Sequence, residues 1–306
     1  DWAAALRDNA VAKADAYFKA LFNRSEVQNI TITASQTNSG GSTLTVDGSG
    51  TIPTSFTKLL GFSDLTFKSS STVKWGSTKL RVALALDNTG SMANAGKMAA
   101  LKAATKNLLD ILQAAAKTPG DVQVSIVPFA KDVNVGANYY TAEWLDWSDW
   151  DEENGEDVST KICTNGKGKR KKCTTSTTWV PADHKTWNGC VTDRAQDYDV
   201  RNTLPTVTNK DTLFVAEQYD DCPTALLPLT YDWAALSRKV DEMTPAGNTN
   251  ITIGLAWAWQ TLTPGAPLNP PPPPPDTQQI IILLTDGDNT ENRFSTSQGA
   301  IDFRAK

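Results

Sequence analysis

Two apolar runs that each lead to an aspartate constrain the fold of this chain more than any other feature. Residues 80–86 read LRVALAL and end at Asp87, and residues 279–284 read QIIILL and lead to Asp286. Runs of this length are typical of strands covered on both faces, as in a parallel sheet between two layers of helices. We therefore expect two buried strands whose carboxyl ends carry carboxylates.

The segment after Asp87 continues with a strand–helix–strand pattern. Residues 97–116 are rich in Ala and Leu, which predicts a helix, and residues 122–129 read as a second buried strand. Strand, helix and strand together make the βαβ unit of a parallel sheet. The sequence thus predicts an α/β fold with a doubly wound, mostly parallel sheet over residues 79–306.

A separate module is expected before this domain. Over residues 2–22, apolar side chains recur at helical spacing with charged residues between them, which predicts an amphipathic helix. Stretches that favour β-structure follow at residues 27–34, 42–52 and 65–75. A helix followed by antiparallel strands makes a small α+β module over residues 1–78.

The middle of the chain, residues 130–230, shows few helical or strand periodicities and reads as a long insertion held by disulfides. Its tryptophans, at positions 144, 147, 150, 179 and 187, favour an internal core over a carbohydrate-binding platform. After the insertion, helices are predicted over residues 232–243 and 251–262. Six prolines at 270–275 then form a stiff spacer before the last strand.

All four cysteines lie in the insertion. Their separations lack the close pairs of a zinc site, and the single histidine, His184, stands alone among them, so disulfides are favoured. Disulfides imply an oxidising compartment. Four cysteines allow three pairings, of which we prefer Cys163 with Cys173 and Cys190 with Cys222.

Charge and hydropathy limit the possible partners. The formal net charge of −5 and the pI near 5.0 argue against nucleic-acid binding. A basic run at residues 167–172 follows an acidic run at 146–157; we read them as solvated, complementary charge blocks, with contact to an anionic surface as the alternative. No apolar run is long enough to cross a bilayer, and because the sequence opens on Asp1 we expect a membrane anchor before it in the full-length protein.

The loop after the first buried strand carries the strongest chemical signal. Asp87, Thr89 and Ser91 place a carboxylate and two hydroxyls at alternate positions where the strand meets a helix. A hard divalent cation prefers such oxygen ligands, and ligands of open parallel sheets bind at the carboxyl ends of the strands. The alternative is a helix N-cap, in which Thr89 or Ser91 satisfies free backbone N–H groups. A phosphate loop does not fit, because Met98 stands where Ser or Thr is needed after Lys97.

These motifs resemble those of von Willebrand factor A domains. Residues 87–92, DNTGSM, fit the D-x-[ST]-x-S signature, residues 285–287 resemble the later T-D-G motif, and residues 245–251 look like the loop that supplies a further threonine. The resemblance implies a Rossmann-like fold and an adhesion site for a divalent cation, with Mg2+ favoured over Mn2+ or Ca2+. Some ligands would act through water. The ligands that it implies are Asp87, Thr89, Ser91, Thr249 and Asp286.

A closer resemblance, to TadG-like proteins of bacterial tight adherence (Tad) pilus systems, rests on other segments as well. They are residues 187–191 with Asp193 and Arg194, residues 214–218, and residues 257–259. It implies a role in pilus assembly or adhesion at the periplasm or cell surface. It also implies an N-terminal transmembrane helix that precedes this region in the sequence. An A domain continues beyond its T-D-G motif, so the resemblance also implies a domain that is incomplete at its C-terminus.

The expected function is binding, without enzymatic activity. In adhesion-type A domains the ion keeps one position for a carboxylate of the partner, so we expect a protein partner that offers Asp or Glu, among pilus or envelope components or on a host surface. One alternative is a structural envelope anchor in which the metal only stiffens the loops. A metal-dependent hydrolase is the other, and it lacks an identifiable general base.

Overall fold

The computed structural model describes residues 13, 16, 26–37, 42–54, 58, 61, 63–75, 79–165 and 171–305. The chain divides into two compact units, residues 1–78 with 274–276 and residues 79–273 with 277–306. None of the described helices is long and apolar enough to cross a membrane. Of the helix predicted over residues 2–22, all but Lys13 and Ala16 lie outside the described residues.

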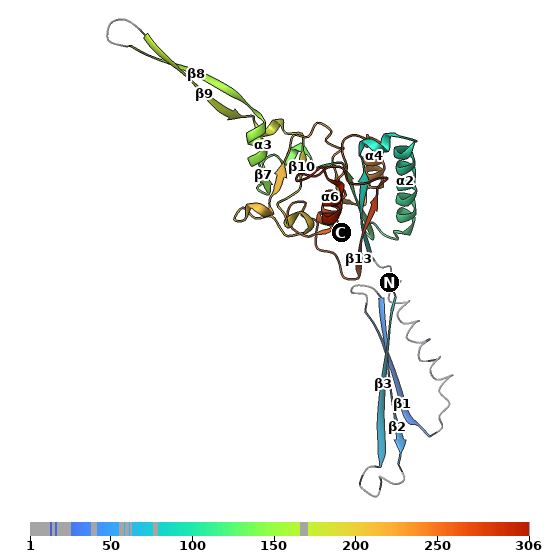
Figure 1. Ribbon diagram of the computed structural model, residues 1–306. Coiled ribbons are helices and arrows are strands. Elements are labelled where there is room, and N and C mark those ends of the chain that lie inside the picture. Colours follow the sequence, from blue (N-terminus) through green and yellow to red (C-terminus); the bar gives the residue numbers. More distant parts are fainter. Residues whose placement is uncertain are drawn as a thin grey trace. The chain divides into compact units, whose positions relative to one another are not determined.

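The first unit contains a three-stranded antiparallel sheet in the order β1–β2–β3 (Figure 1). Its strands are β1 (Gln28–Thr37), β2 (Ser42–Pro53) and β3 (Asp64–Trp75). They lie where the β-favouring stretches predicted them, because Thr, Val and Ile fit the pleated surface of a sheet.

The second unit is built on an eight-stranded sheet in the order β13–β4–β5–β6–β10–β11–β7, with β12 also paired to β5. The three long strands are parallel neighbours, with Leu284 opposite Leu86 and Asp87 opposite Phe129. This is the α/β sheet predicted from the sequence, but the prediction that the strand before Asp286 is buried is wrong. That strand, β13, lies at the edge of the sheet, and Ile280 and Ile281 are 41% and 37% exposed. The strands of the whole sheet are β4 (Lys79–Asp87), β5 (Val122–Phe129), β6 (Val133–Asn134), β7 (Leu145–Asp146), β10 (Cys190–Thr192), β11 (Phe214–Ala216), β12 (Leu227–Thr230) and β13 (Thr277–Leu284).

Helices cover both faces of this sheet, which makes it doubly wound. Alternate residues of β4 belong to different cores: Val82, Leu84 and Leu86 pack with α2 and α4, whereas Ala83 and Ala85 pack with α5. Period-two alternation on a strand covered on both faces explains why the run is apolar throughout. The helices are α2 (Lys97–Ala115), α3 (Ser148–Glu153), α4 (Trp233–Glu242), α5 (Ile251–Leu262) and α6 (Gln298–Ala305).

Arg81 interrupts the apolar run of β4, yet it is only 3% exposed. Its guanidinium donates to the carbonyl of Pro271 at 2.7 Å and to Gln123 Oε1 at 3.0 Å. A buried guanidinium needs acceptors. The polyproline segment thus serves as more than a spacer, because it supplies a carbonyl that satisfies a buried charge.

The insertion is more regular than its sequence predicts. It adds β6, β7, β10, β11 and β12 to the main sheet, mostly by antiparallel pairing. These strands have two to four residues each, too few to show a periodicity. Among its described strands, β8 (Gly155–Asn165) and β9 (Lys171–Pro181) pair with each other and not with the main sheet, as a hairpin (Figure 1). The Cys163–Cys173 disulfide joins the two strands.

The tryptophans of the insertion build part of the core. Trp150 and Trp187 are buried and Trp144 and Trp147 pack against the same cluster, whereas Trp179 on the hairpin is 41% exposed. The core interpretation therefore holds for four of the five. His184 stacks on Trp147, with ring centroids 3.8 Å apart, and its Nε2 lies 2.7 Å from Asp151 Oδ1.

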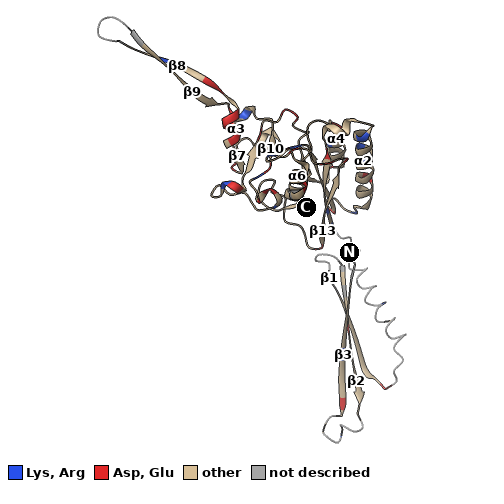
Figure 2. Ribbon diagram, viewed as in Figure 1, with Lys and Arg blue, Asp and Glu red and all other residues tan. Residues whose placement is uncertain are grey.

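The acidic run at residues 146–157 is only partly solvated, because three of its carboxylates contact basic side chains. Asp149 pairs with Arg293, Asp151 contacts His184, and Asp146 lies 3.4 Å from the ammonium of Lys210. Figure 2 shows the acidic residues of α3 at the start of the hairpin. In the basic run, residues 167–170 lie outside the described residues.

Candidate metal centre

The candidate centre forms where β4 and β13 end side by side. Asp87 is the last residue of β4 and has no exposed surface, while Asp286 follows two residues after β13. Because the two strands are parallel and in register, their carboxyl ends reach the same edge of the sheet. The fold therefore brings together two aspartates that are 199 positions apart in the sequence.

Three hydrogen bonds orient the carboxylate of Asp87. Its Oδ1 accepts from the Thr89 hydroxyl at 2.6 Å and from the Thr89 backbone N–H at 2.9 Å. Its Oδ2 accepts from the hydroxyl of Thr285 at 2.7 Å. The tight turn after β4 places Thr89 over the aspartate, so the carboxylate is held in one orientation although it is buried.

Ser91 links this cluster to the second aspartate. Its Oγ donates to Asp286 Oδ1 at 2.7 Å and lies 3.1 Å from the hydroxyl of Thr89. Thr89 precedes a short 3-10 helix, η2 (Gly90–Ala93), yet its side chain makes no capping hydrogen bond. The side chain of Thr89 therefore does not cap this helix. Asp87, Thr89, Ser91 and Asp286 form one continuous chain of contacts.

Thr249, the fifth predicted ligand, lies on the loop that precedes α5 and is 4% exposed. Its backbone exchanges two hydrogen bonds with Thr290, at 2.8 and 2.9 Å. This loop contacts the loop that follows β4, because the backbone N–H of Gly90 donates to the carbonyl of Gly247 at 2.9 Å. Within the described residues, no hydrogen bond joins the Thr249 hydroxyl to the other four predicted ligands.

Gly247 is needed for this approach of the loops. Its φ of 77° lies in the left-handed region, and a Cβ there would come within 2.4 Å of the Tyr219 hydroxyl. Both conditions favour glycine.

Lys97 supplies the positive charge nearest to the centre. Its ammonium forms an ion pair with Asp286 Oδ2, the oxygen that Ser91 leaves free. Burial raises the pKa of Asp286, but the hydrogen bonds from Lys97 and Ser91 outweigh it and keep that pKa below its usual value. Asp286 is thus held as an anion, the form that binds a cation.

The donor set suits a hard divalent cation. Two carboxylates and three hydroxyls provide only oxygen donors, and two carboxylates neutralise a 2+ ion without exceeding its charge. In the part of the chain that the structure describes, no group of three or more His, Cys, Asp or Glu side chains is placed to hold a metal. A cation here would therefore depend on the hydroxyls.

Sequence reasoning overlooked two residues of the centre. Thr285 was quoted only as part of a motif, although its hydroxyl orients Asp87, and Lys97 was considered only in relation to a phosphate loop. Thr285 was open to prediction, because it follows the apolar run directly and precedes Asp286. Nothing in the sequence indicated that Lys97, at the start of α2, would contact Asp286.

Comparisons with known proteins give a limited result. No family model matches the chain, and no curated protein matches it. Among solved structures, it is similar to the pilus adhesin SpaC of Lactobacillus rhamnosus GG, with 15% identity, a TM-score of 0.32 and coverage of 85% of this chain and 19% of SpaC. The pilus adhesin RrgA of Streptococcus pneumoniae gives 16% identity, a TM-score of 0.33 and coverage of 87% and 26%.

The PilB minor pilin of Streptococcus sanguinis gives 11% identity, a TM-score of 0.31 and coverage of 87% of this chain and 48% of PilB. The chain thus spans about a fifth to a half of these proteins. At such TM-scores the similarity carries no argument about function. What the fold and the site define is a doubly wound α/β protein with a hydroxyl-rich, acidic centre at the ends of two parallel strands.

Proposed function

We propose that this chain is an extracytoplasmic adhesion or protein-binding domain that holds a divalent cation, most favourably Mg2+, at the centre formed by Asp87, Thr89, Ser91, Thr249 and Asp286. The observation that carries the proposal is the continuous contact from Asp87 through Thr89 and Ser91 to Asp286. Polar side chains from two separate segments, the loop of residues 87–91 and Asp286, meet in this way, and their oxygens are the donors that a hard cation prefers.

The bound cation would supply an electrophilic position that attracts a carboxylate of the partner. The chain's residues would prepare that position. Thr285 and the backbone of Thr89 fix the Asp87 carboxylate, so its oxygens need little reorganisation. The hydroxyls of Thr89 and Ser91 add donors without adding negative charge, which leaves the ion attractive to an acidic side chain.

More specifically, we propose that the protein takes part in Tad-type pilus assembly at the cell envelope. The two disulfides, Cys163–Cys173 and Cys190–Cys222, are typical of a protein that folds in an oxidising compartment. Several residues behind the TadG-like resemblance are buried, among them Trp187 and Trp257, which are each 1% exposed. Buried residues stabilise a fold and do not contact a partner, so these residues support a shared fold more directly than a shared partner.

A structural role for the centre is the second candidate. Asp87 already accepts three hydrogen bonds from the chain itself, so the cluster also stabilises the loops without an ion. We propose no hydrolase, because both carboxylates of the centre are assigned as ligands and neither remains as a general base.

Calorimetric titration of Mg2+, Mn2+ and Ca2+ into chelator-treated protein tests the proposal. We expect saturable binding that Asp87→Asn abolishes, with Asp110→Asn, in the middle of α2, as a control that leaves binding unchanged. An ion that binds with no loss of affinity in Asp87→Asn would overturn the assignment. If no ion binds and Asp87→Ala only lowers the thermal midpoint, the structural role is the correct one.

A further inference from the structure

The Thr249 loop, defined as residues 245–250, is fixed at both ends. Near its start the N–H of Ala246 donates to a carbonyl of the loop that follows β4, at 2.8 Å. At its end Asn250 caps α5 and has no exposed surface. Thr249 itself bonds to Thr290 through its backbone N–H and carbonyl. The part of the loop between these contacts needs a support of its own.

One peptide group in the middle of this loop is held from two sides. Its carbonyl, of Gly247, accepts a hydrogen bond from the N–H of Gly90 at 2.9 Å. Its N–H, of Asn248, donates to the hydroxyl of Tyr219 at 3.1 Å. The first contact comes from the loop that follows β4, whereas the second comes from a different part of the chain. Tyr219 thus helps to orient the residue that directly precedes Thr249.

The segment that carries Tyr219 also packs closely against this peptide group. A Cβ on Gly247 would lie 2.4 Å from the Tyr219 hydroxyl and 3.0 Å from the Cβ of Asp221. Both neighbours belong to residues 217–226, which connect β11 to β12 and form no helix or strand. A segment without regular structure depends on individual contacts for its position. What holds Tyr219 therefore also decides how the Thr249 loop is supported.

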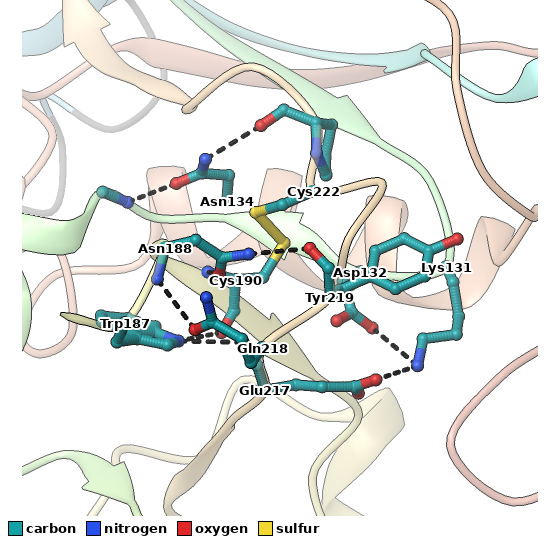
Figure 3. Close-up of a disulfide and its surroundings, with 12 residues drawn as sticks. Lys131, Asp132, Asn134, Trp187, Asn188, Cys190, Glu217, Gln218, Tyr219 and Cys222 are labelled. Carbon is teal, nitrogen blue, oxygen red and sulfur yellow. Dashed lines mark hydrogen bonds and ion pairs between the residues drawn. A yellow bond between two sulfur atoms is a disulfide. The ribbon is translucent and has the colours of Figure 1, made fainter. Parts of the chain in front are cut away.

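Tyr219 is held against the main sheet by a hydrogen bond and a disulfide (Figure 3). Its carbonyl accepts from the side chain of Asn188 at 2.7 Å and from the N–H of Cys222 at 3.1 Å. Cys222 is bonded to Cys190, the first residue of β10, which lies between β6 and β11 in the sheet. Cys190 has no exposed surface. The disulfide therefore ties the segment around Tyr219 to a buried strand.

We propose that Tyr219 is a positioning residue of the metal centre and that the Cys190–Cys222 disulfide acts on the centre through it. The inference rests on the proposed function, because a ligand loop can be positioned only for an ion that the centre holds. The path leads from the disulfide to the Tyr219 hydroxyl, then to the N–H of Asn248, and so to Thr249. A loop held in place before binding loses less freedom when the ion arrives, which raises the affinity.

The first test is Tyr219→Phe, which keeps the ring that Lys131 contacts and removes only the hydroxyl. Calorimetric titration should show an affinity for Mg2+ that is lower by about 2- to 13-fold, the effect of one hydrogen bond. The thermal midpoint should hardly change, because Asn248 is exposed and water can accept its N–H. Tyr231→Phe is the matched control, since Tyr231 is 51% exposed and lies beside Val122, at the start of β5 and thus at the opposite end of the strands.

A second measurement needs no ion. Amide hydrogen exchange, followed by NMR in EDTA, reports how firmly each part of the loop is held. In Tyr219→Phe the exchange should be faster at Asn248 and Thr249. It should stay the same at Ala246, whose N–H donates to the loop that follows β4.

The part played by the disulfide needs a pair of double variants. Cys190→Ser with Cys222→Ser should weaken Mg2+ binding, whereas Cys163→Ser with Cys173→Ser, on the hairpin, should not. Both are measured well below their thermal midpoints. Adding Tyr219→Phe to the first double variant should weaken binding further by less than about twofold, because the two changes act along one path.

The outcomes separate this inference from the proposed function. If the unaltered protein binds no ion, the proposed function fails and the positioning role fails with it. If the protein binds an ion and Tyr219→Phe binds it equally well, the inference fails alone. Full additivity of Tyr219→Phe with the loss of the disulfide overturns the path through Tyr219. If the disulfide variant does not fold, the affinity and exchange of Tyr219→Phe still decide the positioning role.

Discussion

The ammonium of Lys97 contacts one oxygen of Asp286 while the hydroxyl of Ser91 donates to the other. Lys97, at the start of α2, thus pairs with the carboxylate that the resemblance to A domains assigns as a ligand of a cation. The pair is partly exposed, since the side chain of Lys97 is 41% exposed and that of Asp286 12%. An arriving ion must compete with this ammonium.

Replacing Lys97 should strengthen ion binding. Surface ion pairs of this kind contribute about 0.2–1 kcal/mol, so Lys97→Met should raise the affinity for Mg2+ by about 1.4- to 5-fold. Lys97→Arg keeps the positive charge and should leave the affinity near its original value. Calorimetry on both variants makes the comparison, and weaker binding by Lys97→Met would show that the lysine assists the site.

Thr285 should matter to the ion without contacting it. Its hydroxyl donates to Asp87 Oδ2 at 2.7 Å, and loss of a residue that orients a ligand typically weakens metal affinity by about 10–100-fold. Thr285→Val preserves the shape and removes the hydrogen bond. The measurement is Mg2+ titration, with Thr141→Val, an exposed threonine outside the centre, as the comparison. An unchanged affinity in Thr285→Val would exclude this orienting role.

The two disulfides should differ in their effect on stability. Cys190–Cys222 ties a strand of the main sheet to a neighbouring loop across 32 positions, and closing a loop of that length contributes about 4 kcal/mol. Cys163–Cys173 joins β8 to β9, which pair with no other strand. Serine pairs at each site test this by thermal unfolding: the first should lower the midpoint strongly and the second hardly at all.

Asp193 should make stability depend on pH. Burial raises the pKa of Asp193 to about 6 from 3.8, despite hydrogen bonds from Arg293 and Asn250. Because the folded-state pKa is above the unfolded one, the folded state binds more protons between these values. Stability therefore falls as pH rises from about 4 to 6 and stays lower above that, by about 3 kcal/mol.

Asp193→Asn removes this contribution while preserving the size of the side chain. Its unfolding free energy should fall less than that of the original protein between pH 4 and pH 7.5. Asp132, whose pKa burial also raises, titrates in both proteins and so leaves their difference largely intact. Denaturant unfolding at several pH values measures the difference, and parallel curves would mean that Asp193 is charged throughout.

Much of the fold follows from local pattern. The apolar runs before Asp87 and Asp286 became adjacent parallel strands, and α2, α4 and α5 lie within one or two residues of their predicted bounds. The first of these strands, β4, is covered on both faces, so its run is apolar and distinctive. The second, β13, was wrongly expected to be buried: it lies at the edge of the sheet, with Ile280 41% and Ile281 37% exposed. The loop of residues 87–91 was also recognisable, because Asp87, Thr89 and Ser91 lie within five consecutive residues.

The rest was decided by contacts between distant segments. The short strands of the insertion are defined by the strands they pair with, and two or three residues carry no period of their own. Lys97 meets Asp286, and Glu291 meets the Thr249 loop, only because the sheet aligns its strand ends. The sequence by itself determined which residues can carry the chemistry. Only the tertiary structure decided which charges lie together, because electrostatic energy depends on distance in space and not along the chain.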